Sequence, residues 1–309
     1  MIIINTSTGW NMGDDLIREG VVELLGLRGA TMLFIDRHIL KGGKRIHQES
    51  KMLPSVEEMA EQASLLVVAG TPEWCGGGVA PLYAACAKRN VPTYIVGVGR
   101  TGSPGQLLRL KDNIAKATAR DDAALEFIRK QGIECERFLD PAFYAPRPKC
   151  EKQVDLVVCY RAAGGNGVYS SQLDDYWRRF ADMHKPDIVT VHEPQEISRA
   201  RAIFGKEKVF FSSEWHAFMP IYVSAKRVFS GRIHGAVPSL ASGATTWIVY
   251  NRPKVECLST VAAIEGSALT MLSYGDEIPE ALPEVDPKPT LRFIKDQGWH
   301  HAEYLREPR

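Results

Sequence analysis

Segments with strand and helix patterns alternate along this chain, and the alternation breaks once near its middle. Short apolar runs, such as residues 65–69 and 154–160, are followed by segments with the period of an amphipathic helix. This alternation is typical of a parallel sheet that is covered by helices on both faces. The break falls at residues 144–152, where two prolines are interleaved with basic residues, as in a linker. The fold class that follows is α/β, with two Rossmann-like, doubly wound domains that face a cleft.

The linker places a domain boundary near residue 150. The chain has 309 residues, which is more than one hydrophobic core usually holds. We therefore predict an N-terminal domain over residues 1–150 and a C-terminal domain over residues 151–309, in a GT-B-like arrangement. The polar tail, residues 283–309, is rich in proline and aromatic residues. It either docks on the first domain or stays loosely ordered.

Composition argues against several classes of function. The net charge of +1 provides no strong field for nucleic acid, and no stretch approaches the ~20 apolar residues of a membrane span. The first residues lack the basic and apolar regions of a signal peptide. The six cysteines are scattered without a C-x-x-C pair, which favours buried thiols in a reducing cytoplasm over zinc or disulfides. We expect no metal or other cofactor, and the oligomeric state stays open.

The most informative segment of the second half is residues 230–251. An apolar strand pattern at residues 225–229 leads into Ser-Gly, and Arg232 and His234 follow just before an apolar helical run. Open α/β sheets bind ligands where a strand passes into a helix in this way. The free N–H groups and the positive dipole end of the helix favour an anion. We predict an anion site that includes a proton donor, His234.

Arg161 also lies at the end of a strand pattern, earlier in the second half. It ends the strand pattern at residues 154–160 and precedes a glycine-rich loop, so we predict that it projects into the cleft. His192 and Glu193 end the next strand pattern. They either supply acid–base chemistry or simply begin a helix, because Glu193 precedes a proline.

Two loops of the first half follow strand patterns: a polar loop at residues 11–15 and a glycine-rich loop at residues 70–78. Three consecutive glycines in the loop at residues 70–78 allow a ligand to approach the backbone closely, and a tryptophan there can stack on a sugar. The structural alternatives to ligand binding are a flexible turn at residues 70–78 and an ordinary helix cap at Asp14. The candidate ligand-binding residues of the two loops are Asn11, Gly13, Asp14, Gly70, Trp74 and Gly77.

A third loop carries a dinucleotide-like pattern. Residues 97–102 match G-x-G-x-x-G, and Asp121 lies about 20 residues further on. However, the pattern follows a late strand of its half, and Ser103-Pro-Gly interrupts the helix start that would receive a pyrophosphate. Nicotinamide binding is therefore a secondary alternative, and Gly99 is retained as a candidate for binding another ligand.

Five segments, in this order, resemble the polysaccharide pyruvyl transferase family over roughly residues 3–255. They are NMGDDLI, GTPEWCGGG, VPTYIVGVGRTGSP, ARDDAALEFIRKQGIECERFLDPAF and SGRIHGAVPSLASGATTWIVYNRPKV. The last two carry the specific motifs, and the third explains the dinucleotide-like match. Three positions depart from the family pattern, because Ala124 stands for its Ser, Thr245 for its Pro and Asn251 for its Asp.

The resemblance implies a transferase of polysaccharide biosynthesis. Such enzymes move the pyruvyl unit of phosphoenolpyruvate onto two hydroxyls of a saccharide acceptor, form a ketal and release phosphate. By this resemblance, Arg232 and Arg161 bind the carboxylate or phosphate of the donor, and His234 is the general acid. The N-terminal domain then carries the acceptor side, and the C-terminal domain carries the donor side, with Asn251 among the substrate-binding residues.

Two alternatives remain open at this point. A glycosyltransferase that uses a nucleotide-sugar has the same GT-B-like architecture. A non-catalytic saccharide- or anion-binding relative retains the fold without the reaction, and the departures at Ala124, Thr245 and Asn251 motivate this second alternative.

Overall fold

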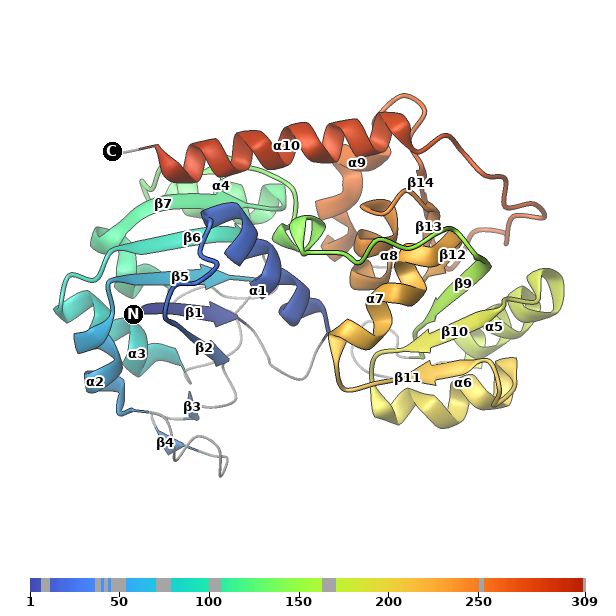
Figure 1. Cartoon of the computed structure of the whole chain (residues 1–309), viewed down its shortest axis with the longest axis horizontal. Coiled ribbons are helices and arrows are strands. Elements are labelled where there is room, and N and C mark those ends of the chain that lie inside the picture. The colour runs from blue at the N-terminus through green and yellow to red at the C-terminus, as the bar shows by residue number, and fades with distance from the viewer. Residues whose placement is uncertain are drawn as a thin grey trace. The chain divides into compact units, whose positions relative to one another are not determined.

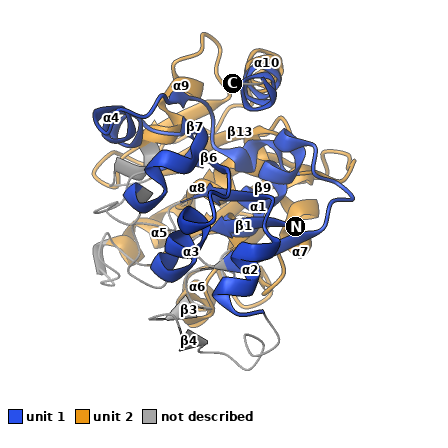
Figure 2. Ribbon diagram, turned by 90° about the vertical axis from the view of Figure 1, so that its left-hand side faces the viewer, with its two compact units in different colours: residues 1–10, 14–145, 297–309 blue, residues 11–13, 146–296 orange. Residues whose placement is uncertain are grey.

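The chain folds into two compact units, which Figure 2 shows in different colours. Unit 1 comprises residues 1–10, 14–145 and 297–309, and unit 2 comprises residues 11–13 and 146–296. The chain thus first enters the main part of unit 2 between residues 145 and 146, inside the predicted linker. The computed structural model describes residues 1–6, 12–36, 40–41, 44–45, 54–70, 79–99, 107–162, 171–249 and 253–307.

A parallel six-stranded sheet forms the centre of unit 1, in the order β2-β1-β5-β6-β7-β8 (Figure 1). Its strands are β1 (Ile2–Thr6), β2 (Met32–Asp36), β5 (Leu65–Ala69), β6 (Thr93–Val98), β7 (Ile114–Ala119) and β8 (Glu136–Arg137). Its helices are α1 (Met12–Leu25), α2 (Val56–Gln62), α3 (Ala80–Lys88) and α4 (Asp122–Lys130), with 3₁₀ helices at Leu107–Asn113 and Pro141–Tyr144. A separate antiparallel pair consists of β3 (Leu40–Lys41) and β4 (Lys44–Arg45).

Unit 2 contains a second parallel six-stranded sheet, in the order β11-β10-β9-β12-β13-β14. Its strands are β9 (Val154–Tyr160), β10 (Ile188–Val191), β11 (Val209–Phe211), β12 (Ala225–Ser230), β13 (Thr245–Val249) and β14 (Leu269–Leu272). Its helices are α5 (Ser171–His184), α6 (Ile197–Phe204), α7 (Trp215–Ser224), α8 (Ile233–Leu240) and α9 (Ser259–Ala262), with 3₁₀ helices at Pro194–Glu196 and Pro253–Leu258. The strand order reverses between β9 and β12, which is the point where doubly wound sheets bind ligands.

Local sequence explains most of these elements. The central strands are apolar runs because parallel sheets are covered on both faces, and β5 and β9 are buried over most of their lengths. Ser55 caps α2, and its capping box with Glu58 is present as predicted. The prediction that Asp14 caps a helix is wrong, because α1 begins at Met12 and places Asp14 inside its first turn.

The polar tail forms one long helix, α10 (Lys288–Arg306), which begins in unit 2 and ends in unit 1. Within unit 1, its fully buried His301 ring stacks on Phe138 with centroids 4.4 Å apart. The Nε2 atom of His301 lies 3.0 Å from Oγ1 of Thr118 on β7. Burial lowers the pKa of His301 to about 3, so the ring is neutral near pH 7.

A buried ion pair organises the loops of unit 1. The Arg120 guanidinium, just after β7, donates to the carboxylate of Asp140, and both side chains are almost fully buried. Asp140 also accepts from the backbone N–H of Ala142 and so caps the 3₁₀ helix. Gly97 packs against Pro141, the residue that follows Asp140. Its φ of +59° favours glycine, and a Cβ at this position would lie only 2.2 Å from the proline Cδ.

Three further findings bear on the sequence-based expectations. Four cysteines are buried and free as predicted, but Cys150 is exposed, and Cys75 lies outside the described residues; the buried four are Cys86, Cys135, Cys159 and Cys257. No described helix is both long enough and apolar enough to cross a bilayer. Within the described ranges, no group of three or more His, Cys, Asp or Glu side chains is arranged to hold a metal ion.

Asp140→Asn is expected to destabilise the protein strongly. The substitution leaves the Arg120 charge buried without its carboxylate, which costs about 3–5 kcal/mol. Thermal unfolding followed by circular dichroism measures the effect as a fall in Tm. Asp122→Asn is the matched control, because Asp122 pairs with Arg137 while remaining more than half exposed. Equal losses of Tm in the two variants would contradict a special role for the buried pair.

His301 is expected to make stability fall with acid. An unfolded histidine has a pKa of about 6.5, so between pH 6.5 and about 3 the unfolded chain binds a proton that the folded chain excludes. The contribution of His301 is therefore intact above pH 6.5 and is lost as the pH falls toward 3, by up to about 1.4 kcal/mol per pH unit. His301→Gln should flatten the fall in Tm between pH 7 and 5.

The exposed neighbour provides the control for this pH effect. His300 lies next to Glu303 at the surface of α10, and His300→Gln should leave the pH dependence of Tm unchanged. If His301→Gln retains the wild-type slope, titration of His301 does not limit stability in acid.

Candidate functional site

The segment from Ser230 to His234 connects β12 to α8, as the sequence predicted. Ser230 Oγ accepts a hydrogen bond from the Arg232 backbone N–H at 3.1 Å and donates to the Arg232 carbonyl at 2.6 Å. These two bonds close a tight turn that places Arg232 at the N-cap of α8 and His234 in its first turn. The turn therefore sets where the side chains of Arg232 and His234 begin. The dipole of α8 adds a positive potential there.

Three neighbouring strands bring candidate residues of unit 2 together at the carboxyl ends of the strands. Strands β10, β9 and β12 are adjacent and parallel, so the residues that follow them lie side by side. Arg161 follows β9, Glu193 follows β10, and Gly231 follows β12. A Cβ built on Gly231 would lie 3.0 Å from the Cβ of Arg161, which shows how closely the ends of β9 and β12 approach. The site thus lies at the switch point of the strand order.

The Arg232 guanidinium is held between two carboxylates. Its Nη1 donates to Glu193 Oε1 at 2.8 Å, and its Nη2 donates to Glu196 Oε2 at 2.6 Å. The Arg232 side chain is 11% exposed, that of Glu193 is 42% exposed, and that of Glu196 is fully buried. Burial alone would lower the pKa of Arg232, but Glu196 and Glu193 more than offset this and hold it above its ordinary value.

A buried hydrogen-bonded network lies beside this ion pair. Thr190 Oγ1 donates to the carbonyl of Val158 and lies 2.7 Å from the Tyr222 hydroxyl. The Tyr222 oxygen also lies 2.7 Å from His192 Nε2, and the same nitrogen is 3.5 Å from Sγ of Cys159. Burial, together with the charges of Arg232 and His234, holds the pKa of His192 well below its usual range.

His234 lies against the start of α1. Residues 11–13 group with unit 2, and a Cβ built on Gly13 would lie only 1.8 Å from His234 Nδ1. No side chain larger than that of glycine fits at this position without moving the imidazole. Gly13 therefore contacts His234 directly, which gives a physical reason for glycine at the second residue of α1.

The other predicted site residues are distributed as follows. Gly70 follows β5 with a φ of +73°, and Gly99 packs against the side chains of Arg120 and Asp121, so the structure gives Gly99 a packing role. Asp14 is buried in the first turn of α1. Four predicted residues lie outside the described part of the chain: Asn11, Trp74, Gly77 and Asn251.

Two of the three departures from the family pattern occupy structural positions. The backbone N–H of Ala124 donates to the capping carboxylate of Asp121, a bond that does not depend on the side chain of residue 124. Thr245 Oγ1 accepts from the backbone N–H of Val285 at 2.8 Å, at the start of β13.

Sequence reasoning missed the partners of the predicted residues. Glu196 and Tyr222 lie on separate elements, and no local pattern marks either of them as part of a site. In the sequence, Glu196 is typical of an ordinary helix start. In the structure it is a fully buried carboxylate that accepts a hydrogen bond from Arg232, 36 residues away in the sequence. A buried carboxylate becomes recognisable only when the cation that balances it is known.

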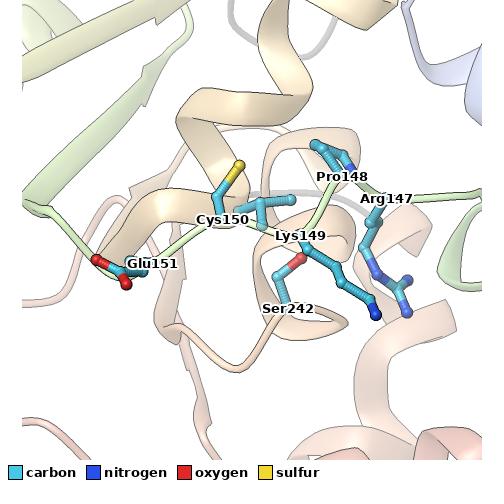
Figure 3. Close-up of a pocket in the computed structure, with 7 residues that line it drawn as sticks. Arg147, Pro148, Lys149, Cys150, Glu151 and Ser242 are labelled. Carbon is cyan, nitrogen blue, oxygen red and sulfur yellow. The ribbon is translucent and has the colours of Figure 1, made fainter.

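A pocket elsewhere in unit 2 is distinct from these strand ends. It has a volume of about 500 Å³ and lies between the linker and the ends of α7 and α8. Figure 3 shows the side chains of Arg147 and Lys149 extending from the linker beside Ser242. Because no strand ends at this pocket, the cluster around Arg232 and His234 is the better candidate site.

Comparison with known proteins assigns the chain to a family and a fold type. Residues 11–253 match the family model described as polysaccharide pyruvyl transferase. No curated protein matches the chain. A candidate UDP-N-acetylglucosamine 2-epimerase structure from Listeria monocytogenes is similar over 100% of this chain and 91% of its own, with a TM-score of 0.57 and 12% identity.

Two further solved structures show the same likeness. The UDP-GlcNAc 2-epimerase of Neisseria meningitidis covers 99% of this chain and 94% of its own, with a TM-score of 0.52 and 8% identity. That of Methanocaldococcus jannaschii covers 96% of this chain and 99% of its own, with a TM-score of 0.53 and 12% identity. At such identities the likeness concerns the fold alone, and it confirms the predicted α/β class of two Rossmann-like, GT-B-like units.

Gly13→Ala is expected to move the His234 ring without unfolding the protein. The added methyl group meets the imidazole, which can rotate, whereas Gly20→Ala drives a methyl group to within 1.8 Å of the backbone carbonyl of Pro141. We expect Gly20→Ala to lose about 1–3 kcal/mol of stability and Gly13→Ala to lose much less.

The ring can be observed directly. In Gly13→Ala, the NMR signal of the His234 Cε1–H, assigned by its loss in His234→Gln, should shift, while the signal of the exposed His216 stays in place. An unchanged His234 signal in a folded Gly13→Ala variant would show that the two residues do not touch in solution.

Proposed function

Because the chain belongs to the polysaccharide pyruvyl transferase family, we propose that it transfers the pyruvyl unit of phosphoenolpyruvate to saccharide hydroxyls. The product is a ketal, and phosphate is released. The observation that carries this proposal is the arrangement at the switch point of the second sheet. There, Arg161, Arg232 and His234 lie beside the N-terminus of α8. The scattered, mostly buried cysteines favour a reducing cytoplasm as the site of the reaction.

The donor is a small, strongly charged anion, and the chemistry of the strand ends suits it. Arginine guanidinium groups bind carboxylates and phosphates in a planar, forked geometry. Free N–H groups at a helix N-terminus favour the same charge. We assign Arg161 and Arg232 to the carboxylate or phosphate of the donor, with the first turn of α8 as a further contact.

His234 is proposed as the general acid. Protonation of the donor's methylene carbon gives a methyl group and leaves an oxocarbenium-like carbon, which a sugar hydroxyl attacks. Phosphate then leaves with the shared electron pair, and a second hydroxyl attacks the same carbon to close the ketal. Of the two hydroxyl protons that are released, one restores His234 and the other leaves with the phosphate. A proton donor placed in this way typically contributes ~10²–10⁴-fold to the rate.

His234 and His192 are two imidazoles at these strand ends, and the transferred proton is assigned to one of them. His192 is unsuited to the same role, since burial and the neighbouring charges of Arg232 and His234 keep it neutral. We therefore assign the transferred proton to His234.

The acceptor side is proposed for the polar loops of the first half. Trp74 would stack on a sugar face, and glycines would allow the backbone to approach the sugar. Asn251 is proposed as a further substrate-binding residue. The residues included in this proposal are Asn11, Gly13, Asp14, Gly70, Trp74, Gly77, Gly99 and Asn251.

His234→Gln and Arg161→Ala are expected to separate turnover from donor binding. With phosphoenolpyruvate and a panel of saccharides that carry paired hydroxyls, phosphate release should fall about 10²–10⁴-fold in His234→Gln, because the acid is lost. Binding of phosphoenolpyruvate, measured by calorimetry, should change little. In Arg161→Ala the Kd should rise about 10- to 100-fold, because a charged hydrogen bond is lost. His216→Gln, at an exposed position, is the control.

The alternatives have distinct signatures in the same experiments. Stabilisation by UDP but not by phosphoenolpyruvate in a thermal-shift panel would favour a nucleotide-sugar glycosyltransferase. Binding of phosphoenolpyruvate without phosphate release on any acceptor would favour a non-catalytic binding protein. Normal turnover by His234→Gln would assign the proton to another group.

A further inference from the structure

The two carboxylates that bind Arg232 differ in how firmly they are held. Together they occupy both terminal nitrogens of the Arg232 guanidinium, Nη1 and Nη2. For an incoming anion to take one of these positions, a carboxylate must move away. The surroundings of the two side chains show which of them can do so.

Glu196 is fixed on both sides. Its Oε2 accepts from Arg232 Nη2 at 2.6 Å, and its Oε1 accepts from the backbone N–H of Ala162 at 2.8 Å. Ala162 follows Arg161, so this carboxylate ties the end of β9 to the N-cap of α8. The side chain is fully buried, and withdrawing it would leave Nη2 of Arg232 and the N–H of Ala162 without this acceptor. Glu196 therefore stays in place whatever binds nearby.

Glu193 is held much more loosely. Its side chain is 42% exposed, and its Oε1 accepts from Arg232 Nη1 at 2.8 Å. Its other oxygen accepts from the side chain of Gln195, an exposed residue only two positions away. A partly exposed ion pair of this kind typically contributes little to stability, because water solvates a released carboxylate.

We propose that the Glu193 carboxylate is an internal stand-in for the anionic group of the donor. It occupies Nη1 of Arg232 until a carboxylate or phosphoryl oxygen of the ligand takes the same position, and it then turns out into solvent. Glu196 keeps Nη2 throughout, so the guanidinium retains its orientation during the exchange. The identity of the ligand as phosphoenolpyruvate rests on the proposed function, whereas the exchange itself requires only an anion.

This exchange has a measurable consequence. Glu193 competes with the ligand for Arg232, and its charge also repels the ligand. Glu193→Gln removes both effects while preserving the shape of the side chain. Calorimetric titration of the full-length chain with phosphoenolpyruvate, and separately with inorganic phosphate, should give Kd values about five- to tenfold lower in Glu193→Gln than in the wild type. Glu214→Gln, at an exposed position outside the cluster, should bind as the wild type does.

Glu196→Gln provides the opposite case. It weakens the support of Arg232 without freeing Nη1, so binding of both ligands should weaken about tenfold or more. Circular dichroism verifies that this variant is folded, and Glu196→Asp, which keeps the charge, should recover part of the affinity.

The outcomes separate this inference from the proposed function. If phosphate binds more tightly to Glu193→Gln while phosphoenolpyruvate binds to neither protein, the exchange stands and the donor assignment fails. If Glu193→Gln binds both anions as the wild type does, or more weakly, Glu193 is a fixed support and the inference is wrong. It is equally wrong if neither anion binds to either protein, because then no ligand takes the place of Glu193.

Discussion

The buried carboxylate of Glu196 is the interaction on which the candidate site depends. Parallel strands end side by side, but nothing in the sheet itself fixes the loops that leave them. Glu196 provides that constraint, since one oxygen binds the backbone after β9 and the other binds the N-cap arginine of α8. With both oxygens bonded, the cost of burying the charge is largely offset. Arg161 and His234 consequently have defined positions relative to each other.

Both units use a buried arginine–carboxylate pair just beyond the ends of their strands, and the two pairs differ in exposure. In unit 1, the side chains of Arg120 and Asp140 are both almost fully buried, which suits a structural role. In unit 2, Arg232 faces two carboxylates, one of them partly exposed. A partly exposed carboxylate can be reached by a ligand, whereas a fully buried one cannot. This difference in exposure is one reason why the cluster around Arg232 is the candidate site.

The sequence predicted what depends on local pattern and missed what depends on distant partners. The strands Leu65–Ala69 and Val154–Tyr160 were predicted to the residue, because the first is an uninterrupted apolar run and the second is interrupted only by Asp155. No strand was predicted at Ile114–Ala119, where alanines and a lysine weaken the pattern although the sheet buries them. The position of Arg232 and His234 follows from a local turn, whereas the role of Glu196 depends on a contact across 36 residues.

Unit 1 is assembled from both ends of the chain, and this has a consequence for biosynthesis. The surface of β7 and Phe138 that receives His301 leaves the ribosome long before α10 does. At typical elongation rates the interval from the linker to the last residues is roughly 10–30 s. During that interval β7 and Phe138 are already made, whereas His301, which packs on them, is not. This part of the unit 1 core therefore closes only after α10 has been synthesised.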